Sequence, residues 1–390
     1  MKKKILVFTA SRSEYGILRS IIFNLSKIKN IELSIMASGS HLSSYFGNTI
    51  SEIKKDGFKN VIKIKTFDKK IEKESISETI SIGIKKISKY LAKKKPDLIL
   101  VVGDRHELFS ICISGLLNNI PVAHIHGGEN TNYVTDDYIR HSVTKLSSFH
   151  FASNETYRKR IIQMGEKPKN VILSGSPSID IIKKTNFLSK RELEVSLNIN
   201  LKKKIFLVTY QPVTLDKKKS KYEINNLLIS LSNFPNHIII FTLPNHDRYS
   251  DLIINKIKSY CKNKANFFYF KSLGHLKYLS LMKVSELVIG NSSSGIIEAP
   301  YLNVPTVNIG QRQEGRLMGR SILSCNSNKM IIISTIKKAL IIKKNKRVFL
   351  KKLYGNGDAS KKISNFISKL RLKEFKLGKK FNDIKFRYEK

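Results

Sequence analysis

The stretch GNSSSGIIEAP, which starts at Gly290, places small and hydroxyl-bearing residues directly after an apolar run. If a strand ends at this glycine and a helix begins among the next residues, free backbone N–H groups and hydroxyls can bind an anion. The hydroxyls belong to Ser292, Ser293 and Ser294. Glu298 cannot bind phosphate but can accept hydrogen bonds from ribose hydroxyls. A nucleoside diphosphate would satisfy both features; the alternative is an ordinary serine N-cap and a solvent-facing glutamate.

Arginines also follow apolar runs, in a chain that otherwise prefers lysine as its basic residue: Arg12, Arg105, Arg312 and Arg316. The planar guanidinium suits the oxygens of a diphosphate because it donates two parallel hydrogen bonds. A single arginine at such a place is usually an ordinary surface residue. The recurrence at successive run ends favours anion binding and supports the diphosphate interpretation.

Asp104, Glu129 and Asp136 are the acidic side chains that could exchange protons with a substrate, and His126 lies between them in the sequence. Chemistry at a sugar carbon needs a base that removes a weakly acidic proton and an acid that protonates the departing oxygen. Paired carboxylates in a closed cleft can have their pKa values driven apart for these roles. The alternative for Asp136 is the N-cap of a helix that starts near it.

Further polar candidates after apolar runs are His41, His124, Gln211, Asn245 and Asp247. For His124 we expect a structural, hydrogen-bonded histidine. The pair His124 and His126 with Glu129 lacks a clear further ligand, so we expect no metal and no cofactor.

These residues need a scaffold that gathers strand ends, and the chain alternates short apolar runs with helical patterns up to about residue 340. The strands expected in the first half are 4–10, 31–39, 96–104, 120–129, 149–153 and 171–178, with helices over 74–94 and from about 136. Those expected in the second half are 204–210, 237–243, 265–270, 286–290 and 304–310.

This alternation predicts an α/β protein with parallel sheets, right-handed crossovers and helices on both sheet faces. The lysine-rich stretch 183–204 breaks the rhythm and marks a domain boundary. We therefore expect two Rossmann-like, doubly wound domains facing a cleft. Residues 1–182 form the domain with the acid/base residues, 183–365 the domain with the anion site, and 366–390 a basic C-terminal tail. Ligands of such sheets collect at the carboxyl ends of the strands.

The composition limits the classes of function. The 390 residues include 71 lysines and arginines against 30 acidic residues, a formal charge of +41. Because the lysines are scattered through every segment, we expect a solvated basic exterior and no nucleic-acid partner; a polyanion-binding surface is the alternative. The cysteines Cys112, Cys261 and Cys325 are far apart, which supports neither a disulfide framework nor a zinc site. No apolar run approaches the about 20 residues of a membrane span, so we expect a cytoplasmic protein.

The motifs that follow the apolar runs resemble, in order and over nearly the whole chain, those of a known family. They are SRSEYG (11–16), SGSHLSSYFGNT (38–49), GDR (103–105), HIHGGE (124–129), DDYIRHSVTKLS (136–147), GSPSID (175–180), GNSSSGIIEAP (290–300), IGQRQEGR (309–316) and YGNGDAS (354–360). The chain thus resembles the hydrolysing UDP-N-acetylglucosamine 2-epimerases of sialic acid biosynthesis. The wider superfamily of UDP-N-acetylglucosamine 2-epimerases has a glycosyltransferase-B-like fold.

The resemblance implies removal of the C2 proton with loss of UDP to give a glycal, followed by addition of water. From UDP-N-acetylglucosamine the product is N-acetylmannosamine. The implied catalytic set is Asp104, His126, Glu129, Asp136, Arg140 and Gln211. The implied substrate-binding set is Arg12, His41, Arg105, Gly175, Asn245, Asp247, Ser292, Ser293, Ser294, Glu298 and Arg312. The partner is a UDP-linked sugar, and we expect a homodimer or homotetramer.

Two positions depart from the family pattern. Many relatives have glutamate where His126 stands, so Glu129 could supply the carboxylate here. Relatives usually have histidine where Gln211 stands, and glutamine cannot transfer a proton. Either that role is not essential or the substrate differs, for example a 2,4-diacetamido-trideoxy sugar for legionaminic acid synthesis. A non-hydrolysing epimerase and a glycosyltransferase are the remaining alternatives.

Overall fold

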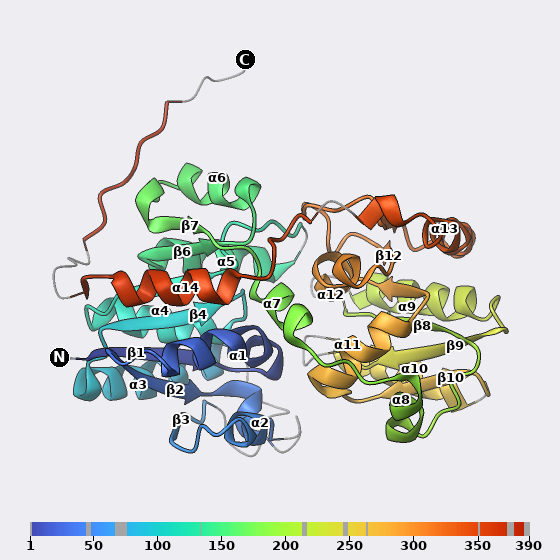
Figure 1. The fold of residues 1–390 in the computed structure, drawn as a ribbon, viewed down its shortest axis with the longest axis horizontal. Coiled ribbons are helices and arrows are strands. Elements are labelled where there is room, and N and C mark those ends of the chain that lie inside the picture. The colour runs from blue at the N-terminus through green and yellow to red at the C-terminus, as the bar shows by residue number, and fades with distance from the viewer. Residues whose placement is uncertain are drawn as a thin grey trace. The chain divides into compact units, whose positions relative to one another are not determined.

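A computed structural model describes residues 2–43, 48–66, 76–132, 134–212, 217–244, 249–262, 264–349, 352–372 and 378–385. The chain divides into two compact units. Unit 1 comprises Met1–Glu129, Asp136–Ile181 and Tyr354–Lys390, and unit 2 comprises Asn130–Thr135 and Ile182–Leu353. Each unit is an α/β unit built on its own sheet (Figure 1).

Unit 1 contains a 7-stranded sheet in the order β3-β2-β1-β4-β5-β6-β7. Its described strand pairs are all parallel. The strands are β1 (Lys3–Thr9), β2 (Ile31–Ala37), β3 (Val61–Lys63), β4 (Leu98–Val102), β5 (Val122–Ile125), β6 (Phe149–Ala152) and β7 (Val171–Leu173). The order reverses between β1 and β4, which is where ligands bind in doubly wound sheets.

Unit 2 repeats this arrangement with a 6-stranded parallel sheet in the order β10-β9-β8-β11-β12-β13. The strands are β8 (Lys204–Thr209), β9 (His237–Thr242), β10 (Phe267–Phe270), β11 (Leu287–Gly290), β12 (Thr306–Ile309) and β13 (Ile322–Cys325). Here the order reverses between β8 and β11, so the prediction of two Rossmann-like sheets is confirmed.

Helices connect the strands and cover both sheets. In unit 1 these are α1 (Arg12–Ser26), η1 (Gly39–Leu42), α2 (Ile50–Lys55), α3 (Ile76–Lys94), α4 (Glu107–Leu117), α5 (Thr135–Leu146), α6 (Glu155–Gln163), η2 (Pro168–Asn170), α7 (Pro177–Lys184, which runs into unit 2) and α14 (Ala359–Lys369). In unit 2 they are α8 (Lys190–Leu197), α9 (Lys217–Leu231), α10 (Ser250–Lys262), α11 (Gly274–Val284), α12 (Ser293–Ile297), η3 (Ala299–Leu302), α13 (Lys329–Ile342) and η4 (Lys346–Phe349).

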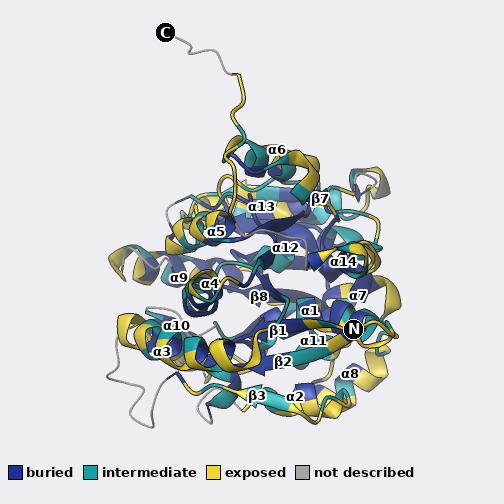
Figure 2. Ribbon diagram, turned by 90° about the vertical axis from the view of Figure 1, so that its left-hand side faces the viewer, coloured by how far each residue is buried: buried dark blue, intermediate teal, exposed yellow. Residues whose placement is uncertain are grey.

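The central strands are apolar throughout because helices bury both of their faces. Along β4, Leu98 and Leu100 belong to one core cluster, and Ile99 belongs to the cluster on the opposite face. The same alternation occurs in β8, where Phe206 and Leu207 lie in different clusters. Figure 2 shows these buried strands among helices with exposed outer surfaces. The sheets therefore hold their strand ends in fixed positions.

The C-terminal segment belongs to unit 1, which corrects the prediction that residues 354–365 form part of the second domain. Ile363 and Ile367 of α14 are buried in the core cluster that contains α1. The side chain of Asp180 accepts hydrogen bonds from the backbone nitrogens of Ala359 (3.0 Å) and Ser360 (2.6 Å). The apolar face of α14, whose residues the prediction divided between the second domain and the basic tail, explains this placement.

The short edge strands β3 and β13, and the helices α7 and α8, were not expected from the sequence. The predicted helix over 74–94 is described from Ile76 onward, and its first two residues lie outside the described part of the chain. Within the described residues, no helix has the length and apolar character needed to cross a bilayer.

Candidate functional site

Asp104 follows β4 at the switch point of the unit 1 sheet, and a buried arginine holds it there. The Nε atom of Arg140, on α5, donates to Asp104 Oδ2 at 3.1 Å, and Nη2 makes a closer contact with the same oxygen. The Arg140 side chain is 1% exposed and the Asp104 side chain 27%. A buried guanidinium needs paired acceptors. Asp104 is thus oriented by protein contacts while remaining partly accessible.

The other nitrogen of the Arg140 fork connects α5 to the end of β5. Nη1 donates to the backbone oxygen of Glu129 at 3.0 Å and to Asp137 Oδ1 at 2.9 Å. The resemblance placed Arg140 near Asp104 and Asp136, and the structure shows Arg140 in contact with Asp104 and Asp137. Asp136 lies half-buried in the first turn of α5. The structure therefore brings Asp104, Glu129 and Arg140 together.

His126 and Glu129 form a buried hydrogen-bonded chain. His126 Nδ1 lies 2.6 Å from Glu129 Oε1, and His126 Nε2 lies 3.2 Å from the hydroxyl of Ser176. Ser153 donates to the same Glu129 oxygen at 3.0 Å. His126 has a φ of 68°, a left-handed conformation that is strained for a residue with a side chain. Since protein groups occupy both ring nitrogens, the imidazole links loops rather than presenting a free base.

The remaining histidines near these strand ends are interior residues. His124 Nε2 donates to the carbonyl of Gly103 at 2.8 Å, and burial lowers the pKa of His124 to about 3. His41 lies within 3.0 Å of the Thr9 hydroxyl and 2.8 Å of the Thr49 hydroxyl, and burial lowers its pKa to about 4. His124 thus has the expected structural environment. The predicted substrate contact of His41 receives no support, because both of its ring nitrogens are occupied.

The arginines of unit 1 lie at the ends of β1 and β4. Arg12 is the first residue of α1, after the N-cap Ser11, and burial lowers its pKa. Arg105 forms a two-pronged contact with Glu107, with Nε 3.1 Å from Oε2 and Nη2 3.2 Å from Oε1. These contacts hold Arg105 beside Asp104 at the switch point.

In unit 2 the serine-rich stretch leaves β11 in the predicted way. Gly290 ends the strand with a φ of 134°, and a Cβ atom there would lie 2.1 Å from the carbonyl oxygen of Thr209. Only glycine allows this close approach. Ser292 is the N-cap of α12, and its hydroxyl accepts from the backbone nitrogen of Ser294. Ser293 is the first residue of this helix, and Glu298 is its C-cap.

Hydroxyl groups form a chain across the unit 2 strand ends. The Ser294 hydroxyl lies 3.0 Å from that of Ser292 and 2.6 Å from that of Tyr278 on α11. The Tyr278 hydroxyl lies 3.4 Å from Thr209, which lies 2.6 Å from Thr242. These neutral groups can donate to an anion at little desolvation cost compared with a buried charge.

Asn291 joins two other predicted residues. Its side chain accepts from the backbone nitrogen of Gln211 at 2.6 Å and donates to the Gln211 carbonyl at 2.8 Å. Its backbone oxygen accepts from Arg312 Nη1 at 3.1 Å and from Gln313 at 2.9 Å. The structure thus brings Gln211, Arg312 and the serine-rich stretch together.

Three residues of the predicted substrate-binding set are not part of these networks or lie outside the described residues. Gly175 has a φ of 82°, and a Cβ there would meet the Cα of Gly355 at 3.1 Å, so it serves a close backbone crossing. Asn245 and Asp247 lie outside the described residues. In the described part of the chain, no cluster of His, Cys, Asp and Glu side chains could hold a metal ion.

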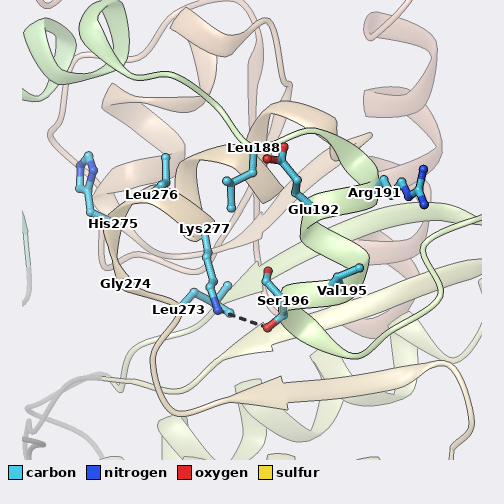
Figure 3. A pocket seen from close by; sticks show the side chains of 10 residues that line it. All are labelled: Leu188, Arg191, Glu192, Val195, Ser196, Leu273, Gly274, His275, Leu276 and Lys277. Carbon is cyan, nitrogen blue, oxygen red and sulfur yellow. Dashed lines mark hydrogen bonds between the residues drawn. The ribbon is translucent and has the colours of Figure 1, made fainter.

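An apolar cavity of about 660 Å³ in unit 2 is separate from these residues. Leu188, helix α8 and the start of α11 line it, and Val195 and Leu276 are among the lining side chains (Figure 3). None of the predicted site residues lines this cavity. Its chemistry does not match the polar strand ends.

Sequence reasoning missed Asn291, Tyr278 and Ser176 as parts of these networks. Asn291 and Ser176 stand inside quoted motifs, so their positions after predicted strands were an available signal. Tyr278 comes from a helix, and only the packing of α11 against β8 brings it to the serines.

Comparison with known proteins identifies relatives along most of the chain. A family model described as UDP-N-acetylglucosamine 2-epimerase matches residues 24–368. The chain is 42% identical over 328 residues to GDP/UDP-N,N'-diacetylbacillosamine 2-epimerase (hydrolyzing) of Campylobacter jejuni, covering 84% of this chain and 85% of the relative. It is 39% identical over 336 residues to polysialic acid biosynthesis protein P7 of Escherichia coli, covering 86% and 85%.

A solved structure of UDP-GlcNAc 2-epimerase from Neisseria meningitidis bound to UDP-GlcNAc matches with a TM-score of 0.81. The match covers 94% of this chain and 100% of that chain at 19% identity, so it is a likeness of fold.

Proposed function

We propose, from the premise that this chain belongs to the UDP-N-acetylglucosamine 2-epimerase family, that it hydrolyses a UDP-linked 2-acetamido sugar with inversion at C2. The first candidate substrate is UDP-N-acetylglucosamine, which would give N-acetylmannosamine and UDP. The observation that carries the proposal is the contact between Asp104 and the buried Arg140 at the switch point of unit 1.

The reaction has two stages. A base removes the C2 proton while the C1–oxygen bond breaks, so that UDP leaves and a C1=C2 double bond forms. Water then adds its hydroxyl to C1, and a proton reaches C2 from the opposite face. Asp104 is the first candidate for a proton-transfer group, since it is partly exposed and is oriented by Arg140. Asp136 and Glu129 are further candidates for acid/base roles.

UDP binding is assigned to neutral and cationic groups. The hydroxyls of Ser292 and Ser294 and the guanidinium of Arg312 are gathered by Asn291 and Tyr278. Such donors suit the diphosphate, while Glu298 can accept from ribose hydroxyls. Arg12 and Arg105 of unit 1 supply further positive charge for the nucleotide.

A 2,4-diacetamido-trideoxy sugar linked to UDP is the second candidate substrate. It is favoured by the 42% identity to the GDP/UDP-N,N'-diacetylbacillosamine 2-epimerase (hydrolyzing) of Campylobacter jejuni. Relatives usually carry histidine at the position of Gln211. Glutamine can keep a polar contact but cannot transfer a proton, which agrees with a sugar substrate other than N-acetylglucosamine.

The test is to incubate the pure protein with each UDP-sugar in D₂O and to follow it by NMR. We expect release of UDP, a free sugar inverted at C2 and one deuterium at C2. No UDP from either substrate would contradict the proposal. An epimerised nucleotide sugar would instead identify a non-hydrolysing enzyme, and an unlabelled C2 would point to a glycosyltransferase.

A further inference from the structure

Glu107 is the buried counter-ion of Arg105. It is the first residue of α4, its side chain is 5% exposed, and it receives both prongs of the Arg105 guanidinium. A two-pronged contact fixes the plane of the guanidinium as well as its position. His106 Nδ1 also lies 3.5 Å from Glu107 Oε2. The orientation of Arg105 therefore depends on Glu107.

A second buried acid, Glu14, comes from α1. Its Oε2 atom accepts from the backbone nitrogens of Ala10 (2.6 Å) and Ser11 (3.0 Å), as part of a capping box with Ser11. Its Oε1 atom is buried and has no hydrogen-bond partner among the described residues. A buried acceptor without a partner costs about 1–3 kcal/mol. A proton on Oε1 would turn this oxygen into a donor.

The loops that carry the two acids converge. A Cβ atom on Gly39, in the turn after β2, would lie 2.8 Å from the carbonyl oxygen of Ala10 and 2.9 Å from Glu107 Oε1. The turns that follow β1, β2 and β4 thus meet with no room for a methyl group. Among the described residues, Arg105, His106 and His41 are further titratable groups that act on the pair.

The electrostatic environment separates the two acids. Burial first, and then the charge of Glu107, raises the pKa of Glu14 to about 8. Burial alone would raise the pKa of Glu107 as well, but Arg105 and then His106 hold it below its ordinary value. One neutral and one ionised carboxyl are expected when two acids share a buried place.

We propose that Glu107 is a positioning residue for Arg105, and that Glu14 stays protonated beside it so that Arg105 faces one counter-charge instead of two. The inference rests on the proposed function, because it assumes that Arg105 helps to bind the diphosphate. Ionisation of Glu14 in mild alkali would add a negative charge near the nucleotide and weaken its binding. The ionisation of Glu14 thereby sets the pH above which the affinity for the nucleotide falls.

The test measures UDP binding by calorimetry at pH 7 and pH 9 with the full chain. For the wild-type protein we expect the UDP Kd to rise severalfold at pH 9. Glu14→Gln mimics the protonated acid, so its Kd should be the same at both pH values. Glu107→Gln should raise the Kd about tenfold or more at both pH values, and Glu107→Asp should recover part of the loss.

Glu192→Gln is the matched control. Glu192 occupies the same capping-box position in α8, with Ser189, but it is exposed and has no acidic neighbour in the box. It should follow the wild-type pH dependence. A Glu14→Gln protein that keeps the wild-type rise at pH 9, or a Glu107→Gln protein with wild-type affinity, would overturn the inference.

The protonation of Glu14 can also be measured directly in the wild-type protein, which tests the inference even if the variants fail to fold. Carbon-13 NMR of the Glu14 carboxyl in the wild-type protein should titrate near pH 8, and a midpoint below pH 5 would overturn the inference. If the protein binds UDP but releases none from sugar nucleotides, only the proposed function fails. If the wild-type protein does not bind UDP, both fail.

Discussion

The carboxyl ends of the two sheets differ in chemistry, although the 6 strands of unit 2 follow the order of the corresponding strands of the 7-stranded sheet of unit 1. In unit 1 the strand ends carry ion pairs, such as Asp104 with Arg140 and Arg105 with Glu107. In unit 2 they carry hydroxyls and amides, of which Tyr278, Ser294 and Asn291 are the clearest. The comparison teaches that a Rossmann-like frame fixes where a site lies, whereas the residues after each strand decide what it can do.

The difference has an energetic basis. A buried charge is stable only with a partner, so the unit 1 groups are already committed to one another. Neutral hydroxyls cost less to bury and can exchange one hydrogen bond for another when a ligand arrives. Substitution of Asp104 in unit 1 should therefore alter proton transfer, whereas substitutions of the hydroxyls and amides of unit 2 should alter binding.

The largest effect is expected for Asp104→Asn. The change keeps the shape of the side chain but removes a proton-transfer group, so UDP release should fall by about 10²–10⁴-fold. The UDP Kd, measured by calorimetry, should change little. Asp137→Asn is the control, since Asp137 also contacts Arg140, at 2.9 Å. An equal loss in both variants would mean that the charge around Arg140 matters and not proton transfer.

Gly290→Ala should strongly destabilise unit 2. The new methyl group would lie 2.1 Å from the Thr209 carbonyl, at a φ of 134°. We expect a loss of about 3 kcal/mol in the free energy of unfolding, measured in urea. Gly103→Ala in unit 1 is the control, because φ there is 87° but an added Cβ would meet no atom of the described residues within 4 Å, apart from the chain neighbours. It should cost about 1–2 kcal/mol, and equal losses would contradict the steric argument.

Mild acid should destabilise unit 1 before unit 2. Burial lowers the pKa of His41, His124 and His150, so their neutral forms are favoured in the folded state. Their stabilising contribution is present above the ordinary pKa of about 6.5 and is lost as the pH falls, by up to about 1.4 kcal/mol per pH unit for each. In unit 2, the pKa of the half-buried His237 is also lowered.

The chain has no tryptophan, so a single tryptophan introduced into either unit can report on the unfolding of that unit. Tyr138 and Tyr222 are suitable places, since they are 76% and 56% exposed. Urea unfolding of Tyr138→Trp and Tyr222→Trp at pH 7 and pH 5.5 should show the larger loss for the unit 1 reporter. A larger loss for the unit 2 reporter would contradict the assignment.

The smallest effect is expected for Tyr278→Phe. It removes the hydroxyl that lies 2.6 Å from Ser294, and UDP affinity should fall by about 0.5–1.5 kcal/mol, with turnover of bound substrate little changed. Tyr15→Phe is the matched control, since it removes a 2.6 Å hydrogen bond to Asp56 in unit 1. If both variants lowered UDP affinity equally, the role of Tyr278 would be general stability.

The sequence predicted the sheets well because both faces of most strands are covered, which produces continuous apolar runs. It failed for β3 and β13, which are short edge strands; β3 is only VIK. The strand-end motifs located Asp104 and the serines, since position after a strand is a local property. The contact of Arg140 with Asp137 depends on which side chains of α5 face the same way, and the contact of Tyr278 with Ser294 depends on packing between segments that are distant in the sequence. Both contacts depend on the three-dimensional structure, which the local sequence does not determine.

The position of α14 determines when each unit can be completed on the ribosome. Unit 2 is continuous from Ile182 to Leu353 apart from the short segment Asn130–Thr135, so nearly all of its chain has emerged before α14 is made. Unit 1 lacks α14, whose Ile363 and Ile367 are buried in its core, until the chain of unit 2 has been translated. The usual order, in which the N-terminal domain folds first, is therefore reversed for its final step. A stalled or truncated chain would expose an apolar surface on α1 that the finished protein never shows.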